Sequence, residues 1–146
     1  MIRNRLSSWC VLCALCVAGV LYVPGALSAE DKAAPAAKQP AKVQRVGVEE
    51  FDKLRANKDN AVLDVRTKEE FKAGHIPGAV NIDFKAADFE QQVRKLDKSK
   101  TYLVHCAAGV RSAGACKKME SAGFKELYDL APGFRAWEKA GKPVEK

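Results

Sequence analysis

The sequence contains no apolar run of the roughly 20 residues that a membrane-spanning helix needs. Its longest apolar run covers residues 9–23, follows Arg3 and Arg5, and ends at a Pro-Gly pair. This layout is typical of a secretory signal peptide. Small side chains followed by two acids predict cleavage after Ala29, so residues 1–29 are expected to be a signal peptide and the protein to be exported: periplasmic if bacterial, otherwise secreted. The alternative is an uncleaved anchor, and only that would attach the protein to a membrane.

The mature chain would also lack a disulfide framework. Cleavage would remove Cys10, Cys13 and Cys16 and leave Cys106 and Cys116. An exported protein held by disulfides usually has cysteines at several separated positions, whereas these two lie in one segment. The fold therefore cannot depend on cross-links.

No basic stripe with interleaved aromatic residues is present, although the formal net charge is +7. Loss of Arg3 and Arg5 with the signal peptide lowers it to +5. The scattered lysines indicate a solvated surface, which is compatible with small anionic substrates and argues against nucleic-acid binding. His75 and His105 are the only histidines, and with the two remaining cysteines they lack zinc-ligand spacing. No metal or other cofactor is expected.

Residues 30–42 (EDKAAPAAKQPAK) contain no large apolar side chain. A stretch rich in alanine, proline and lysine can bury almost nothing, so it is predicted to be a disordered linker. The folded domain is expected over residues 43–146. The chain's apolar share of 47% is sufficient for one packed core.

Short apolar runs alternate with amphipathic stretches within this domain. Strands are expected at residues 43–46, 61–65, 79–82, 101–104 and 127–130. Helices are expected at residues 48–56, 67–73, 87–96, 112–122 and 134–140. The alternation predicts an α/β fold with a mainly parallel, five-stranded sheet flanked by helices. Such sheets bind ligands beyond the carboxyl ends of their strands, and the strand at 101–104 leads to Cys106.

Cys106 begins the loop CAAGVR between a strand and a helix. The small residues Ala107, Ala108 and Gly109 let the backbone curl tightly, so that successive amides point at the sulfur and form an anion-binding nest. The dipole of the next helix adds positive charge, and Arg111 is expected to fold over the loop mouth. Because such groups lower a cysteine pKa, we predict a reactive thiolate rather than a small buried core residue.

The arrangement of a strand, HCAAGVRS and a helix resembles the active-site loop of the rhodanese family. Two further segments agree: residues 63–83 (LDVRTKEEFKAGHIPGAVNID) are similar to the family's first signature, and residues 130–137 (LAPGFRAW) to its C-terminal loop and helix. The resemblance covers essentially all of residues 46–144. One departure is Pro132, where the family often has glycine before Gly133, and it stiffens a loop expected near the site mouth.

The resemblance implies a rhodanese-like domain with sulfurtransferase activity. Cys106 would take sulfane sulfur from a small donor such as thiosulfate, become a persulfide, and pass the sulfur to cyanide or a thiol. A protein thiol is a further acceptor class. Arg111 would steady the anionic donor, while Asp64 and Arg66 would brace the site. The residues expected to hold the persulfide or the donor are Ala107, Ala108, Gly109, Val110 and Arg111.

Two other functions fit parts of this pattern. Cysteine phosphatases and arsenate reductases also surround a cysteine with amides and an arginine, but they resemble HC-x5-R, whereas four residues separate Cys106 from Arg111. The shorter ring should suit one sulfur atom better than phosphate. The second alternative is a persulfide carrier or sulfide-sensing module that holds sulfur for a protein partner without notable turnover, and the sequence leaves it open.

Three other residues receive structural interpretations. By strand alternation, His105 should point away from Cys106. His75 lies in a turn-forming segment and is expected to make a structural hydrogen bond. Cys116 is expected to be buried on its helix, and the alternative is a resolving thiol that attacks an oxidised Cys106.

Overall fold

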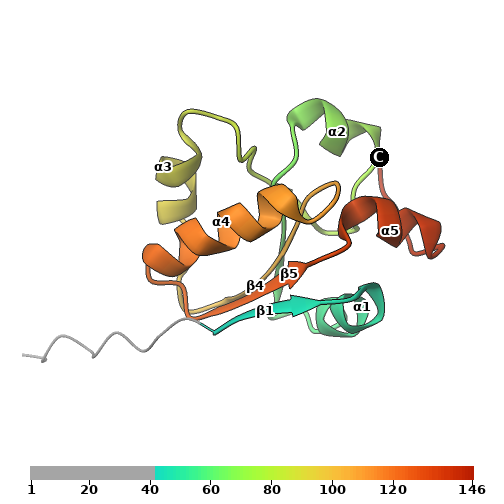
Figure 1. Cartoon of the computed structure of the whole chain (residues 1–146), viewed down its shortest axis with the longest axis horizontal. Helices are drawn as coiled ribbons and strands as arrows, with labels where there is room; N and C mark the ends of the chain where they lie inside the picture. The colour runs from blue at the N-terminus through green and yellow to red at the C-terminus, as the bar shows by residue number, and fades with distance from the viewer. Residues whose placement is uncertain (1–41) are drawn as a thin grey trace, which may run out of the picture. The chain divides into compact units, whose positions relative to one another are not determined.

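A computed structural model describes residues 42–146 as an α/β domain (Figure 1). The predicted signal peptide at residues 1–29 and the predicted linker, apart from its last residue, lie outside the described residues. That last residue, Lys42, is the first residue of strand β1 and so belongs to the sheet. Within residues 42–146, no helix combines the length and the apolar character needed to cross a membrane.

The sheet has five strands, all parallel, in the order β1-β5-β4-β2-β3. The strands are β1 (Lys42–Val46), β2 (Ala61–Asp64), β3 (Val80–Asn81), β4 (Thr101–His105) and β5 (Glu126–Leu130). Strand β4 is central and is buried from its second residue to its last. The parallel sheet predicted from the sequence is confirmed, and its most enclosed strand is the one that leads to Cys106.

Five helices connect and cover the strands. They are α1 (Val48–Arg55), α2 (Lys68–Ala73), α3 (Phe89–Arg94), α4 (Val110–Ser121) and α5 (Gly133–Lys139). Figure 1 shows α3 and α4 on one side of the sheet and α1 on the other. Side chains of α5 pack into the same apolar core as those of α1. The largest difference from expectation that affects the site is the start of α4, which begins two residues early because the glycine before it closes the loop directly onto the helix.

The two faces of the sheet have separate apolar cores. Cys106 belongs to the core beneath α3 and α4, where Phe89 and Met119 pack. His105 points to the opposite face, where its ring lies 6.2 Å from that of Phe51 and 6.0 Å from that of Phe134. The expected alternation of His105 and Cys106 is therefore confirmed.

A buried ion pair braces the carboxyl end of β2. Asp64 is 0% exposed and Arg66 is 4% exposed. The Arg66 Nε lies 3.0 Å from each carboxylate oxygen of Asp64, and Nη2 donates to Oδ2 at 2.7 Å. The same Nη2 donates to the Gly74 carbonyl at 2.7 Å, and the guanidinium lies 3.9 Å from the centre of the Phe134 ring. The pair thus joins β2, the segment after α2, and α5.

We predict that Arg66→Ala strongly destabilises the fold, because it leaves the buried Asp64 carboxylate without its cation. Losing one partner of a buried pair typically costs about 3–5 kcal/mol. Urea unfolding would measure the change. As a control, Arg94→Ala removes an exposed arginine from a 3.9 Å ion pair with Glu90, and it should change stability little. Similar losses in the two variants would contradict a bracing role for Arg66.

Candidate active site

Cys106 is the first residue after β4, and its side chain enters the loop that leads to α4. The residue is only 1% exposed, and its Sγ accepts a hydrogen bond from the Gly109 amide at 3.1 Å. Gly109 has a φ of 82°, in the left-handed region that glycine adopts readily. This turn directs the chain back toward the sulfur and into the first turn of α4.

Hydrogen-bond donors around the sulfur outweigh the effect of its burial. Burial by itself raises the pKa of Cys106. The Ser112 hydroxyl, its amide, and the amides of Ala108 and Gly109 lower it, and the net result is a pKa below the ordinary value. Donors that bond the charged form favour the thiolate, so the sulfur is suited to act as a nucleophile.

The sequence analysis did not identify Ser112 as part of this site. Its Oγ is buried and has no hydrogen-bond partner of good geometry among residues 42–146, which leaves the hydroxyl free to turn toward a thiolate. A serine directly after Arg111 was visible in HCAAGVRS. The expected helix start at Ser112 gave no reason to place its side chain beside the sulfur, whereas the helix starting at Val110 brings it there.

The predicted nest is only partly directed at Sγ. The amides of Ala108 and Gly109 act on it, but those of Ala107, Val110 and Arg111 make no hydrogen bond to it within the described part of the chain. Val110 is 81% exposed at the start of α4. The three amides that do not bond Sγ belong to the same loop. A second sulfur bound to Cys106 would need hydrogen-bond donors there.

The segment after β5 forms a wall against the cysteine loop. The Phe134 amide donates to the Cys106 carbonyl at 2.7 Å, and the Arg135 amide donates to the Ala107 carbonyl at 3.2 Å. These bonds run from the first turn of α5 to the first two residues of the loop. Residues 130–137, which resemble the C-terminal loop and helix of the rhodanese family, therefore lie at the site. This place follows from β5, which pairs with β4 and leads into the segment.

Two glycines permit this close approach. A Cβ on Gly109 would overlap the Ala131 carbonyl oxygen. A Cβ on Gly133, where φ is 71°, would lie 2.5 Å from the Ala108 nitrogen and 2.6 Å from the Ala107 carbonyl. Because each clash is with backbone, no side-chain movement could relieve it.

Arg111 is paired with Glu70 of α2. Its Nη1 donates to Oε2 at 2.7 Å and its Nη2 to Oε1 at 2.9 Å. This bidentate contact is the main reason that the pKa of Glu70 falls to about 2. Glu70 thus holds the guanidinium from α2, and the expected place of Arg111 over the loop mouth stays a prediction.

Glu70 also holds the start of its own helix. Its carboxylate accepts from the Thr67 amide at 3.1 Å, and its amide donates to the Thr67 hydroxyl at 3.3 Å, forming a capping box. The spacing T-x-x-E could have indicated the cap. It gave no sign of Arg111, which lies 41 residues away in the chain.

The other singled-out side chains have structural contacts. His75 Nδ1 donates to the Phe71 carbonyl at 3.1 Å, with the two rings stacked at 3.8 Å. Burial lowers the pKa of His105 to about 4, so it is neutral at pH 7. Burial raises the pKa of Cys116 to about 12, and both Cys106 and Cys116 are free thiols. A protonated, buried Cys116 does not suit the role of a resolving thiol.

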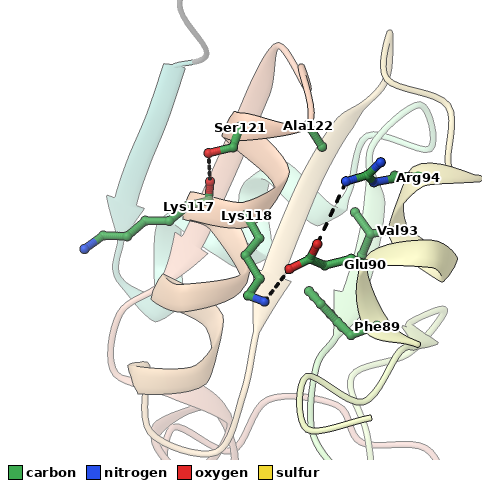
Figure 2. Close-up of a pocket in the computed structure, with 8 residues that line it drawn as sticks. All are labelled: Phe89, Glu90, Val93, Arg94, Lys117, Lys118, Ser121 and Ala122. Atoms are coloured by element: carbon green, nitrogen blue, oxygen red, sulfur yellow. Dashed lines mark hydrogen bonds and ion pairs between the residues drawn. The ribbon is translucent and has the colours of Figure 1, made fainter. Parts of the chain in front are cut away.

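A hollow of about 230 Å³ lies beside the loop, between α2 and α5, and its walls include Ala107, Glu70 and Arg135. Another hollow of about 350 Å³ lies between α3 and α4 and contains no loop residue (Figure 2). Lys118 and Glu90 form a 2.6 Å ion pair there. No cluster of three or more histidine, cysteine or acidic residues that could hold a metal occurs among residues 42–146.

Comparison with known proteins finds consistent similarity over this domain. The family described as "Rhodanese-like domain" matches residues 47–140. The putative sulfurtransferase YtwF of Bacillus subtilis is 37% identical over 63% of this chain and 86% of its own length. Thiosulfate sulfurtransferase 16, chloroplastic, of Arabidopsis thaliana is 38% identical over 57% of this chain and 78% of its own. A rhodanese-related protein from Thermoplasma volcanium has a similar structure, with a TM-score of 0.63 and 28% identity over 70% of this chain and 97% of that chain.

We predict that Gly133→Ala distorts the cysteine loop and raises the Cys106 pKa, because the new Cβ pushes against Ala107 and Ala108. Gly123→Ala is a matched control: Gly123 also has a positive φ, of 93°, but its Cβ would meet nothing within 4 Å. Both variants should lose about 1 kcal/mol to backbone strain. Only Gly133→Ala should lose further stability and alter the pH dependence of Cys106 alkylation. The same stability and the same pH dependence in both variants would contradict the contact between α5 and the cysteine loop.

We also predict that Ser112→Ala moves the Cys106 alkylation profile to higher pH. The hydroxyl stabilises the thiolate, so its loss raises the pKa and slows alkylation by iodoacetamide at pH values below the new midpoint. Ser121→Ala changes the same residue type on the same helix, where the hydroxyl donates to the Lys117 carbonyl at 3.0 Å. It should leave the profile unchanged. A profile in Ser112→Ala that matches the wild type would remove Ser112 from the site.

Proposed function

The chain belongs to the rhodanese-like family, and on this premise we propose that it transfers sulfane sulfur through a persulfide on Cys106. The relatives described as thiosulfate sulfurtransferases support this reaction class. The observation that carries the proposal is the set of donors around a buried sulfur. The hydrogen bond from the Gly109 amide, together with the Ala108 amide and the amide and hydroxyl of Ser112 near the sulfur, holds the pKa of Cys106 down despite burial, as a nucleophile requires.

The reaction we propose has two displacement steps. The Cys106 thiolate attacks the outer sulfur of a donor such as thiosulfate. The sulfur–sulfur bond of the donor breaks, and sulfite leaves with the electron pair. A thiol, as its thiolate, or cyanide then attacks the outer sulfur of the persulfide and regenerates the Cys106 thiolate. Atoms and charges balance without an oxidant or a cofactor.

The loop supplies the electrostatics for both steps. In the free enzyme, the donors on Sγ favour the thiolate that starts the reaction. Once sulfur is bound, we propose that the remaining amides, those of Ala107, Val110 and Arg111, bond the outer sulfur. Fixed backbone donors need little reorganisation as charge moves from one sulfur to the next.

A persulfide carrier is the second candidate. The putative sulfur carrier protein YrkF of Bacillus subtilis is 31% identical over 65% of this chain, and the match spans about half of that protein. A carrier would use the same Cys106 chemistry but would need a protein partner for release. Rapid turnover with cyanide or a small thiol distinguishes the enzyme from the carrier.

We propose that this chemistry takes place outside the cytoplasm. The support is the pattern of residues 1–29, in which two arginines precede a short apolar run and a small residue at the cleavage point. Only residues from Lys42 onward form the described domain, so export would leave every residue of the proposed site in place.

We predict that thiosulfate adds one sulfur atom to the intact mass of the mature protein and that cyanide removes it as thiocyanate. Cys106→Ser should abolish both sulfur loading and turnover, because the nucleophile is gone. Cys116→Ser should retain both, since Cys116 is buried with a pKa of about 12.

Loading that persists in Cys106→Ser would refute the mechanism. An aryl phosphate serves as the substrate control, and the wild type should not hydrolyse it. Hydrolysis of this phosphate that depends on Cys106 would favour the phosphatase interpretation instead.

A further inference from the structure

Glu70 cancels the positive charge nearest to the nucleophile in sequence. Both terminal nitrogens of Arg111 donate to its carboxylate, at 2.7 and 2.9 Å. The side chain of Arg111 is 20% exposed and that of Glu70 is 35% exposed, so the pair lies at the surface of the site and remains partly shielded from water. The ion pair has no net charge, and the Cys106 thiolate near it is negative.

The hollow beside the loop is also close to neutral. Its charged walls are Arg66, Glu70, Arg135 and Glu138. Arg66 is already paired with Asp64, and the exposed Arg135 shares the hollow with the exposed Glu138. These four side chains carry no net charge together, so a donor with two negative charges would meet no excess of positive charge in the hollow.

The size of the hollow suggests a different donor. Its volume of about 230 Å³ is larger than a small tetrahedral anion such as thiosulfate requires, and Ala107 of the cysteine loop forms part of its wall. Mixed positive and negative side chains around it suit an organic molecule that carries both charges. A small thiol compound with an amino and a carboxylate group has this character.

We propose that Glu70 determines donor specificity: by holding Arg111 in an ion pair, it disfavours dianions such as thiosulfate and favours the persulfides of small thiol compounds. The organic part of such a donor would occupy the hollow between α2 and α5. This inference rests on the proposed sulfur transfer through Cys106.

The preferred loading step is a displacement. The Cys106 thiolate attacks the outer sulfur of R–S–SH, the sulfur–sulfur bond breaks, and the thiolate R–S⁻ leaves with the electron pair. The product is Cys106–S–SH, and the total charge is unchanged. No oxidant or reductant is consumed.

Glu70→Gln tests the proposal with little damage to the fold, because glutamine can also complete the capping box with Thr67. The variant frees the Arg111 charge. The kcat/KM for thiosulfate should rise about tenfold at low ionic strength, as expected for one unit charge acting on a dianion over several ångströms, and the gain should shrink with added salt. The kcat/KM for cysteine persulfide should change much less.

Two control variants separate the ion pair from general charge effects. Glu69→Gln removes the same charge one residue away, on an exposed side chain, and should leave the thiosulfate rate near that of the wild type. In the double variant Glu70→Gln/Arg111→Ala the gain should disappear. A fall in the thiosulfate rate in Glu70→Gln would overturn the proposal, because Glu70 would then orient Arg111 for donor binding. An equal rise in Glu69→Gln would also overturn it.

A measurement without sulfur transfer keeps the two proposals distinguishable. The ratio of Cys106 alkylation rates with anionic iodoacetate and neutral iodoacetamide reports the charge at the loop mouth. This ratio should rise in Glu70→Gln and stay unchanged in Glu69→Gln. Suppose that the protein takes up sulfur from both donors, and that Glu70→Gln changes neither this ratio nor the thiosulfate rate. That result would overturn the role of Glu70 and leave the proposed function standing. No uptake from either donor would overturn the proposed function as well.

Discussion

The site depends on a backbone contact between two loops that follow neighbouring strands. Strands β4 and β5 pair in parallel, so the chain leaves both at the same edge of the sheet. There the Phe134 amide bonds the Cys106 carbonyl at 2.7 Å, and Gly109 and Gly133 let the two backbones meet. This contact limits how far the cysteine loop can open. A loop held in this way keeps the Gly109 amide 3.1 Å from the Cys106 sulfur and its other amides around the same turn, and the proposed chemistry depends on that placement.

The two free cysteines are equally buried and differ in the hydrogen-bond donors around their sulfurs. Cys106 and Cys116 are each 1% exposed and belong to the same apolar core. Burial disfavours the thiolate in both, and in Cys116 it raises the pKa to about 12. Cys106 differs because amides and a hydroxyl converge on its sulfur, and its pKa lies below the ordinary value. A nearly closed site can therefore still hold a thiol whose surroundings favour the thiolate.

The sequence predicted the elements well because their signals are local. Alternating apolar runs located the five strands, and the loop after β4 was recognisable from its small residues and glycine. The side-chain partners were not predictable in the same way. Glu70 meets Arg111 across 41 residues of chain, and this contact depends on how α2 packs over the loop. Ser112 was hidden by a local error of two residues, since a helix starting at Val110 instead of Ser112 changes which side chain faces the sulfur.

Both arginines that the sequence associated with the site have carboxylate partners. Arg66 is buried with Asp64, and Arg111 is held by Glu70. Their positive charge is used within the protein, so neither is left as an open anion-binding group. The negative charge on the reacting sulfur must then be stabilised mainly by backbone amides and the Ser112 hydroxyl. Dipoles of this kind act over short distances and are fixed in direction, so they favour a charge on the sulfur at the loop centre without drawing other anions to the surface. In the sulfur transfer that we propose, the amides would determine whether sulfur can be held, and the ion pair of Arg111 with Glu70 would determine which donors can deliver it.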